Sequence, residues 1–152
     1  MSLLAVLQNR ALIAALIVWV LAQVVKLPLE YLRTRTWNWA ILLSVGGMPS
    51  SHSALVSSAA YGIGLTAGFD SAVFAVSSVF ALIVVYDATG IRRQAGRHAE
   101  IINMMIQNLV EGHPLRQEEL REVLGHSPGE ALAGVVMGLV LTQIFWWVYP
   151  AS

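Results

Sequence analysis

The sequence of 152 residues contains no cysteine and few charged side chains. The absence of cysteine excludes disulfide bonds and thiolate metal sites. Charged residues make up only 12% of the chain, against roughly 25% in typical soluble proteins. The formal net charge is zero, so there is no global basic field and no nucleic-acid partner is expected. Apolar residues reach 57%, more than a domain of this size can bury inside itself, which favours a location in a lipid bilayer.

The few charges lie between long uncharged stretches. Residues 11–25 and 131–152 carry none, and Asp70 is the only charged residue between positions 36 and 86. A helix needs about 20 largely apolar residues to cross the hydrocarbon core. The sequence therefore predicts an all-α integral membrane bundle with about four spanning helices and a re-entrant or surface segment, in a single domain over residues 1–152.

The expected helices are separated by polar, glycine-rich and proline-rich segments. They cover residues 4–25, 51–65, a stretch from the turn at 68–71 to about 86, and 128–148, with a surface helix near 99–110. Residues 26–36 are expected to form a polar turn region. Residues 37–45 are apolar but too short to span the bilayer.

The distribution of basic residues predicts the orientation in the membrane. The two helices around Asp70 form a hairpin, so the segments before residue 51 and after residue 86 lie on one side. These two segments hold eight of the nine Lys and Arg residues, and only Arg10 lies elsewhere. By the positive-inside rule this side is cytoplasmic, and both termini are expected outside.

Lys26 and Arg33 form the first candidate phosphate-binding pair. If the stretch between them is helical, a separation of seven residues is nearly two turns, and both side chains project from one face. Lysine supplies a point charge and arginine a planar fork, and both suit a phosphate. The alternative is that these charges only set the topology, and Pro28 between them favours a break in the helix.

Ser50, Ser51 and His52 form the second candidate group, after the glycines and proline of residues 46–49. Serine hydroxyls and free backbone N–H groups at a helix start suit an anion, and a histidine there can transfer a proton near neutral pH. The structural alternative is a helix cap made by Ser50 or Ser51. That alternative does not account for His52.

His126 stands just before the last expected helix. Ser127, Pro128 and Glu130 fit a capping box with proline at the first helical position. Glu130 lies one turn from His126 and is placed to orient its imidazole, as a carboxylate does in a catalytic triad. The cap explains Ser127 and Glu130 but not His126.

Arg92 and Arg93 follow a glycine after the third expected helix and are candidates to close around phosphate oxygens. The alternative is a solvated loop, which is also the interpretation of His98 and His113. The sequence has no paired acidic or histidine signature typical of zinc or magnesium sites, so no metal or other cofactor is expected.

In chain order, these motifs resemble those of the type 2 phosphatidic acid phosphatase superfamily, which also contains the vanadium haloperoxidases. Lys26 and Arg33 match the spacing of its first motif, residues 49–52 its second, and His126 with Glu130 its third. The stretches Gly-Gly-Met-Pro-Ser-Ser-His-Ser, Asp-Ala-Thr-Gly-Ile-Arg-Arg and Gly-His-x-Pro-x-Glu look like a short, divergent branch known from bacteria and plants. The similarity covers nearly the whole chain, and a bacterial inner membrane is the expected location.

The sequence departs from the superfamily pattern at four positions. Thr34 replaces a proline, Ser51 a glycine and Glu130 an aspartate, and Leu120 stands where an arginine is expected. The residue that completes the phosphate site is therefore left open among three arginines, Arg92, Arg93 and Arg121. A competing register would use Arg92 and His98, but Ile102 then occupies the place of the acid.

The resemblance implies a metal-independent phosphatase that hydrolyses a phosphomonoester or pyrophosphate of a lipid through a phosphohistidine. His126 is the implied nucleophile, Glu130 holds its ring, and His52 is the general acid and then the base. The implied phosphate-binding residues are Lys26, Arg33, Ser50, Ser51, Arg92 and Arg93. Phosphatidic acid, phosphatidylglycerol phosphate and polyprenyl pyrophosphate all remain candidate substrates.

Two other functions remain open from the sequence. One is a non-catalytic carrier that binds a phospholipid or polyprenyl phosphate. The other is a structural membrane protein that uses the small residues Ala133, Gly134 and Gly138 as an oligomer interface. The expected partners are the lipid phosphate, membrane lipids and further copies of the chain in a homo-oligomer.

Overall fold

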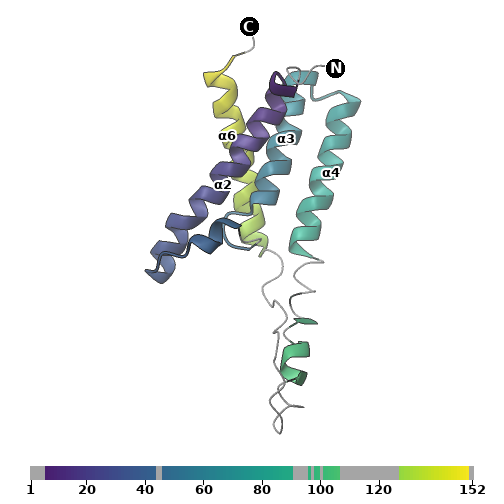
Figure 1. Cartoon of the computed structure of the whole chain (residues 1–152). Helices are drawn as coiled ribbons and strands as arrows, with labels where there is room; N and C mark the ends of the chain where they lie inside the picture. The colour runs from purple at the N-terminus through teal and green to yellow at the C-terminus, as the bar shows by residue number, and fades with distance from the viewer. Residues whose placement is uncertain are drawn as a thin grey trace.

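The structure, a computed structural model, describes residues 6–43, 46–90, 96, 98–99, 101–106 and 127–150. Within these residues every regular element is helical (Figure 1). The elements are α2 (Arg10–Thr34), the 3-10 helix η1 (Trp39–Leu43), α3 (Ser51–Ala67), α4 (Ala72–Thr89) and α6 (Pro128–Val148). The prediction of an all-α integral membrane helical bundle is confirmed. Of the roughly four spanning helices expected, three in the described part of the chain are long and apolar enough to cross a bilayer.

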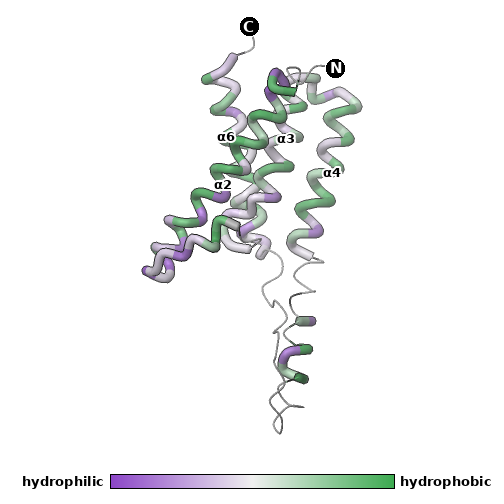
Figure 2. The backbone as a smooth tube through the Cα atoms, in the orientation of Figure 1, coloured by the Kyte–Doolittle hydropathy of each residue, from purple (hydrophilic) through white to green (hydrophobic). Residues whose placement is uncertain are grey.

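The chain is an integral membrane protein. Helices α2, α4 and α6 are long and apolar enough to cross a bilayer. Helix α3 has 17 residues, at the lower end of the spanning range of about 17 to 25. Hydrophobic residues run along most of each long helix (Figure 2). Outward-facing side chains such as Leu82 and Ile83 on α4 are 69% and 60% exposed, which suits contact with lipid rather than with water.

Helix α3 is the central helix of the bundle. It contacts α2, α4 and α6, whereas α4 touches α6 only marginally. The buried residues of α3 are all serine, alanine or glycine. Helix α6 approaches it closely at Gly138, where an added Cβ would lie 2.7 Å from the carbonyl oxygen of Ala54. Small residues allow this approach, and close packing holds helices together where lipid removes the hydrophobic driving force.

Side-chain hydrogen bonds also join α3 to α6. The hydroxyls of Ser58 and Thr142 lie 2.5 Å apart, and the Tyr61 hydroxyl donates to the side-chain oxygen of Gln143 at 2.6 Å. Ser58 and Thr142 are fully buried. These polar groups therefore have partners inside the bundle, as a low-dielectric surrounding requires.

Both chain termini lie at one end of the bundle (Figure 1). At that end Arg10 lies over the ring of Trp146, 4.6 Å from its centroid, and donates to the carbonyl oxygen of Tyr149. The opposite end holds the last turns of α2, η1, and the first turns of α3 and α6. This arrangement agrees with the expected hairpin around Asp70, which places the candidate motifs together at one membrane surface.

The predicted bounds of the first long helix are wrong at both ends. Helix α2 starts at Arg10 rather than near Leu4, because the Asn9 side chain accepts the Leu12 N–H at 3.0 Å and caps the helix. At the other end, α2 continues well past Val25.

The expected polar turn region at residues 26–36 is mostly helical. Helix α2 passes through Pro28 and ends at Arg35, which adopts φ 57° and donates its N–H to the Tyr31 carbonyl. Proline removes one N–H donor from a helix, but membrane helices tolerate it where neighbouring groups compensate. Pro28 therefore does not separate Lys26 from Arg33.

The predicted starts of the other long helices agree with the structure. Ser50 caps α3, and α6 covers residues 128–148 as expected, with the predicted capping box at Ser127 and Glu130. The apolar segment at 37–45 contains η1. Of the expected surface helix at 99–110, residues 101–106 are helical and its remainder lies largely outside the described residues.

Candidate functional site

A cavity of about 360 Å³ lies at the end of the bundle where α2 ends and α6 begins. We refer to it as the charged cavity. Its lining comes from α2, η1, the loop before α3 and the first turn of α6, and consists of Lys26, Leu29, Glu30, Arg33, Ile41, Gly47, Met48, Ser127, Gly129 and Glu130. Three predicted site residues, Lys26, Arg33 and Glu130, therefore meet in one cavity, although about 100 positions separate Glu130 from the other two in sequence.

Lys26 is the only lysine of the chain and is 1% exposed. The negative charge of Glu130 attracts its ammonium group. Gly47 lies against its stem, since an added Cβ at Gly47 would lie 3.9 Å from Lys26 Cδ. Gly47 also has φ 90°, a conformation that glycine adopts without steric cost. The loop before α3 thus lies against the apolar stem of the buried lysine.

Lys26 and Arg33 share one face of α2, together with Gln23 and Glu30. These four residues follow one another at spacings of three or four, which places each about one turn beyond the last. Arg33 is exposed, and its guanidinium forms no hydrogen bond or ion pair with any residue in the described part of the chain. Arg33 lines the charged cavity.

Glu130 connects the start of α6 to the loop before α3. Its carboxylate accepts the Ser127 N–H at 2.9 Å, and the Ser127 hydroxyl accepts the Glu130 N–H at 3.3 Å. Its backbone carbonyl accepts the Ser50 N–H at 3.0 Å. This last bond fixes the second sequence motif beside the third. It also keeps the carboxylate at the wall of the charged cavity, facing Lys26.

Ser50 and Ser51 are both almost fully buried. The Ser50 hydroxyl accepts the Ser53 N–H at 3.3 Å and the Ser53 hydroxyl proton at 3.1 Å, so it acts as the helix cap. Neither serine lines the charged cavity, and neither does His52. His52 is the second residue of α3 and is partly exposed, which leaves its imidazole accessible from the same end of the bundle.

Several predicted site residues lie outside the described residues. These are His126, Arg92 and Arg93, together with the alternative Arg121. His126 directly precedes Ser127 in the chain, and Ser127 lines the charged cavity. Within the described part, no group of three or more His, Asp or Glu side chains is arranged to hold a metal ion.

Glu30 belongs to the charged cavity but was missed by the sequence motifs. It follows Lys26 by four residues and precedes Arg33 by three, which is the spacing of neighbours on one helix face. The signal was therefore present, but it applies only if the helix continues beyond Val25. Gly47 and Met48 were also missed as lining residues, because no periodic pattern indicates which loop residue covers a cavity.

Comparisons with known proteins point in the same direction as the motifs. A family model described as the divergent PAP2 family matches residues 7–141. The chain is also similar to the uncharacterized membrane protein YuiD of Bacillus subtilis (strain 168), with 38% identity over 154 aligned positions that cover 94% of this chain and 98% of that protein. No solved structure matches the chain.

Proposed function

The chain belongs to the divergent PAP2 family, and from this premise we propose that it is a lipid phosphatase that works without a metal ion. The observation that supports the proposal most is the convergence of three distant motifs at one end of the bundle. Lys26 and Arg33 come from α2, His52 from the start of α3 and Glu130 from the start of α6. Each belongs to the residues that carry the resemblance to the phosphatase superfamily.

Lys26 and Arg33 are the proposed phosphate ligands. A buried ammonium group in a low-dielectric cavity interacts strongly with a phosphate, and a guanidinium adds two parallel hydrogen bonds. Seven residues of helix rise by about 10.5 Å, and the long side chains converge on a group held between them. Ser50 caps α3 and donates its N–H to the Glu130 carbonyl, so in this proposal it supports the first turn of α3, and the backbone N–H groups of that turn, beginning at Ser51, are the phosphate ligands. Arg92 and Arg93 are the remaining proposed ligands.

The proposed reaction has two steps. In the first, the His126 imidazole attacks phosphorus, the bond from phosphorus to the lipid oxygen breaks, and His52 gives a proton to that oxygen. In the second, His52 takes a proton from water, the resulting hydroxide attacks phosphorus, and the bond to His126 breaks to release phosphate. Glu130 stabilises the positive charge that develops on the His126 ring.

The proposed location of this chemistry is the cytoplasmic surface of the membrane. The end of α2 and the starts of α3 and α6, which carry the described candidate residues, lie at the end of the bundle opposite the termini (Figure 1). In the sequence, eight of the nine basic residues precede residue 51 or follow residue 86, on the side of the α3–α4 hairpin that holds these helix ends, which is the basis of the assignment.

Phosphate release by the purified protein tests the proposal. The protein in detergent is given phosphatidic acid, phosphatidylglycerol phosphate and polyprenyl pyrophosphate, with EDTA present. We expect release from at least one lipid, and its loss in His126→Ala and in His52→Ala. His98→Ala is the matched control, because His98 is an exposed histidine outside the proposed site, and it should keep full activity.

Two results would overturn the phosphatase proposal. Release that requires a divalent cation would exclude the metal-independent reaction. No release from any lipid, together with retained phospholipid in the purified protein, would favour a binding or carrier function instead.

A further inference from the structure

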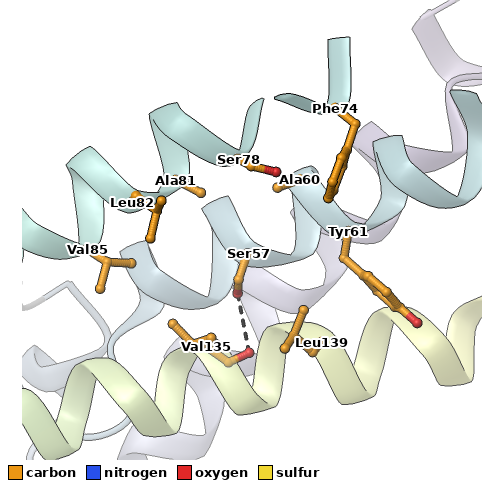
Figure 3. A pocket seen from close by; sticks show the side chains of 10 residues that line it. All are labelled: Ser57, Ala60, Tyr61, Phe74, Ser78, Ala81, Leu82, Val85, Val135 and Leu139. Carbon is orange, nitrogen blue, oxygen red and sulfur yellow. Dashed lines mark hydrogen bonds between the residues drawn. The ribbon is translucent and has the colours of Figure 1, made fainter. Parts of the chain in front are cut away.

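A second cavity, of about 330 Å³, lies within the membrane-spanning part, between α3, α4 and α6 (Figure 3). We refer to it as the apolar groove. Small side chains of α3 and α4, among them Ala60, Ser78 and Ala81, leave the space open. Leu82 and Leu139 stand at its sides and are 69% and 40% exposed. The groove exists because α4 packs on α3 but hardly reaches α6, and it opens sideways toward lipid.

The accessible surface of the apolar groove is almost entirely apolar, so it favours an apolar occupant. The Ser57 hydroxyl already donates to the Ser53 carbonyl at 2.7 Å and lies 3.4 Å from the Val135 carbonyl (Figure 3). The Tyr61 hydroxyl donates to Gln143. The Ser78 hydroxyl is the one other polar side chain of the lining. Since the accessible surface is almost entirely apolar and the Ser57 and Tyr61 hydroxyls have their partners, the occupant that fits is largely hydrocarbon.

The size of the apolar groove suits a slender apolar occupant. Small-molecule sites begin at about 300 Å³, so the groove suits part of one lipid chain.

We propose that the apolar groove holds one hydrocarbon chain of the lipid whose phosphate binds at the candidate site. This inference rests on the proposed function and adds a substrate class to it, a phosphorylated lipid selected by its chain as well as by its headgroup. The groove begins near Ser57 on α3 and Val135 on α6. Each lies five residues beyond a site residue, His52 and Glu130 respectively, which is about 7.5 Å deeper along the helix. A lipid with its phosphate at the helix ends has its chain at that depth.

Filling the groove tests the inference through chain-length selectivity. In Ala81→Phe the new ring occupies the groove, whereas in Ala75→Phe it points from an exposed position of α4 that does not line it. For wild type we expect a much higher kcat/KM with a long-chain lipid phosphate than with its dihexanoyl analogue. Ala81→Phe should lower kcat/KM at least tenfold for the long-chain lipid only, and Ala75→Phe should lower neither. Ser78→Leu is a second, smaller filling variant. Equal losses on both substrates, or none on either, would overturn the inference.

Photolabelling of the unmutated protein gives a readout that does not depend on catalysis. Phosphatidic acid with a diazirine in one acyl chain is incorporated into nanodiscs with the protein, and labelled peptides are mapped by mass spectrometry. Labelling should be concentrated at Leu82, Val85 and Leu139, and Ala81→Phe should abolish it there. Even labelling of all outward residues of α4, such as Val76, would overturn the inference, as would cross-links that show a second copy in the groove. Concentrated labelling without phosphate release would refute the phosphatase while leaving the chain site intact.

Discussion

Lys26 is buried before any ligand binds. Gly47 lies against its stem, and the negative charge of Glu130 offsets part of the cost that burial imposes on its ammonium group. Moving a charged group from water into a protein interior costs free energy, and one oppositely charged partner offsets that cost only in part. A phosphate dianion in the charged cavity would add a second favourable interaction with the Lys26 ammonium group, so the cavity favours an anionic ligand.

Removal of that charge should abolish most of the activity. Lys26→Met keeps the length and apolar stem of the side chain but not the cation. Loss of one preorganised electrostatic contact typically lowers kcat by about 10²- to 10³-fold, and we expect a loss of that order in phosphate release. The thermal unfolding midpoint of the variant serves as the folding control. A well-folded Lys26→Met protein with activity within threefold of wild type would show that Lys26 is not a phosphate ligand.

Arg33 and Arg35 offer a matched pair of exposed cations at the end of α2. Arg33 lines the charged cavity, whereas Arg35 lies just beyond the helix and does not line it. Arg33→Gln should lower kcat/KM by about 10- to 100-fold, since a hydrogen-bonded charge contributes on the order of 1.5–3 kcal/mol. Arg35→Gln should stay within threefold. Similar losses in both variants would indicate a general surface-charge effect instead of a specific contact.

The residues of the candidate site were only partly predictable. Spacing together with the resemblance to the superfamily motifs selected Lys26, Arg33 and Glu130, because both can be read from the sequence. The burial of Lys26 was not predictable, since it depends on the loop at Gly47 folding back over α2. Glu30 was missed for the same reason, because a helix ending at Val25 would not place it beside the two cations.

At the scale of elements, the starts of the helices follow from local chemistry. Ser50 and the Ser127–Pro128 pair satisfy the free N–H groups of α3 and α6, and the sequence predicts both starts. The end of α2 does not follow from local chemistry. A lysine and a proline favour a break there, yet the helix continues through both to Thr34, and η1 contacts α2.

The contact between α3 and α6 should be sensitive to a single methyl group. Gly138→Ala brings a Cβ to 2.7 Å from the Ala54 carbonyl oxygen and 3.1 Å from the Ser58 nitrogen. Overpacking of this kind costs about 1–3 kcal/mol, so the thermal unfolding midpoint in detergent should fall by several degrees. Gly129→Ala is the control, because nothing lies within 4 Å of its added Cβ. An unchanged midpoint for Gly138→Ala would mean that the helices are farther apart than the structure shows.

At the scale of the whole molecule, the bundle has two distinct sides around α3. On one side α2 and the first turn of α6 enclose the charged cavity, and on the other α4 stands apart enough to leave the apolar groove. The number of long helices and the common side of the termini were predictable from the uncharged stretches and the hairpin. The groove was not, because hydrophobicity indicates which faces avoid water but not which neighbours they meet.

The absence of cysteine makes the orientation of the bundle directly testable. Single cysteines at Asp70, in the turn between α3 and α4, and at Thr36, beyond the end of α2, lie at exposed positions on opposite sides. In intact bacterial spheroplasts, a membrane-impermeant maleimide should label Asp70→Cys, and should label Thr36→Cys only after permeabilisation. The cysteine-free wild-type chain controls for background. The reverse pattern would place the candidate site on the outer surface.

The central claim, hydrolysis through a covalent histidine intermediate, is tested most directly by trapping that intermediate. The protein is mixed with a lipid carrying labelled phosphate, quenched within milliseconds to seconds, and digested for mass spectrometry under alkaline conditions that preserve phosphohistidine. We expect an acid-labile phosphate on His126 that is absent in His126→Ala and forms more slowly in His52→Ala, which lacks the proposed acid for the first step. Rapid phosphate release with no label on His126, or a label on another residue, would contradict the account.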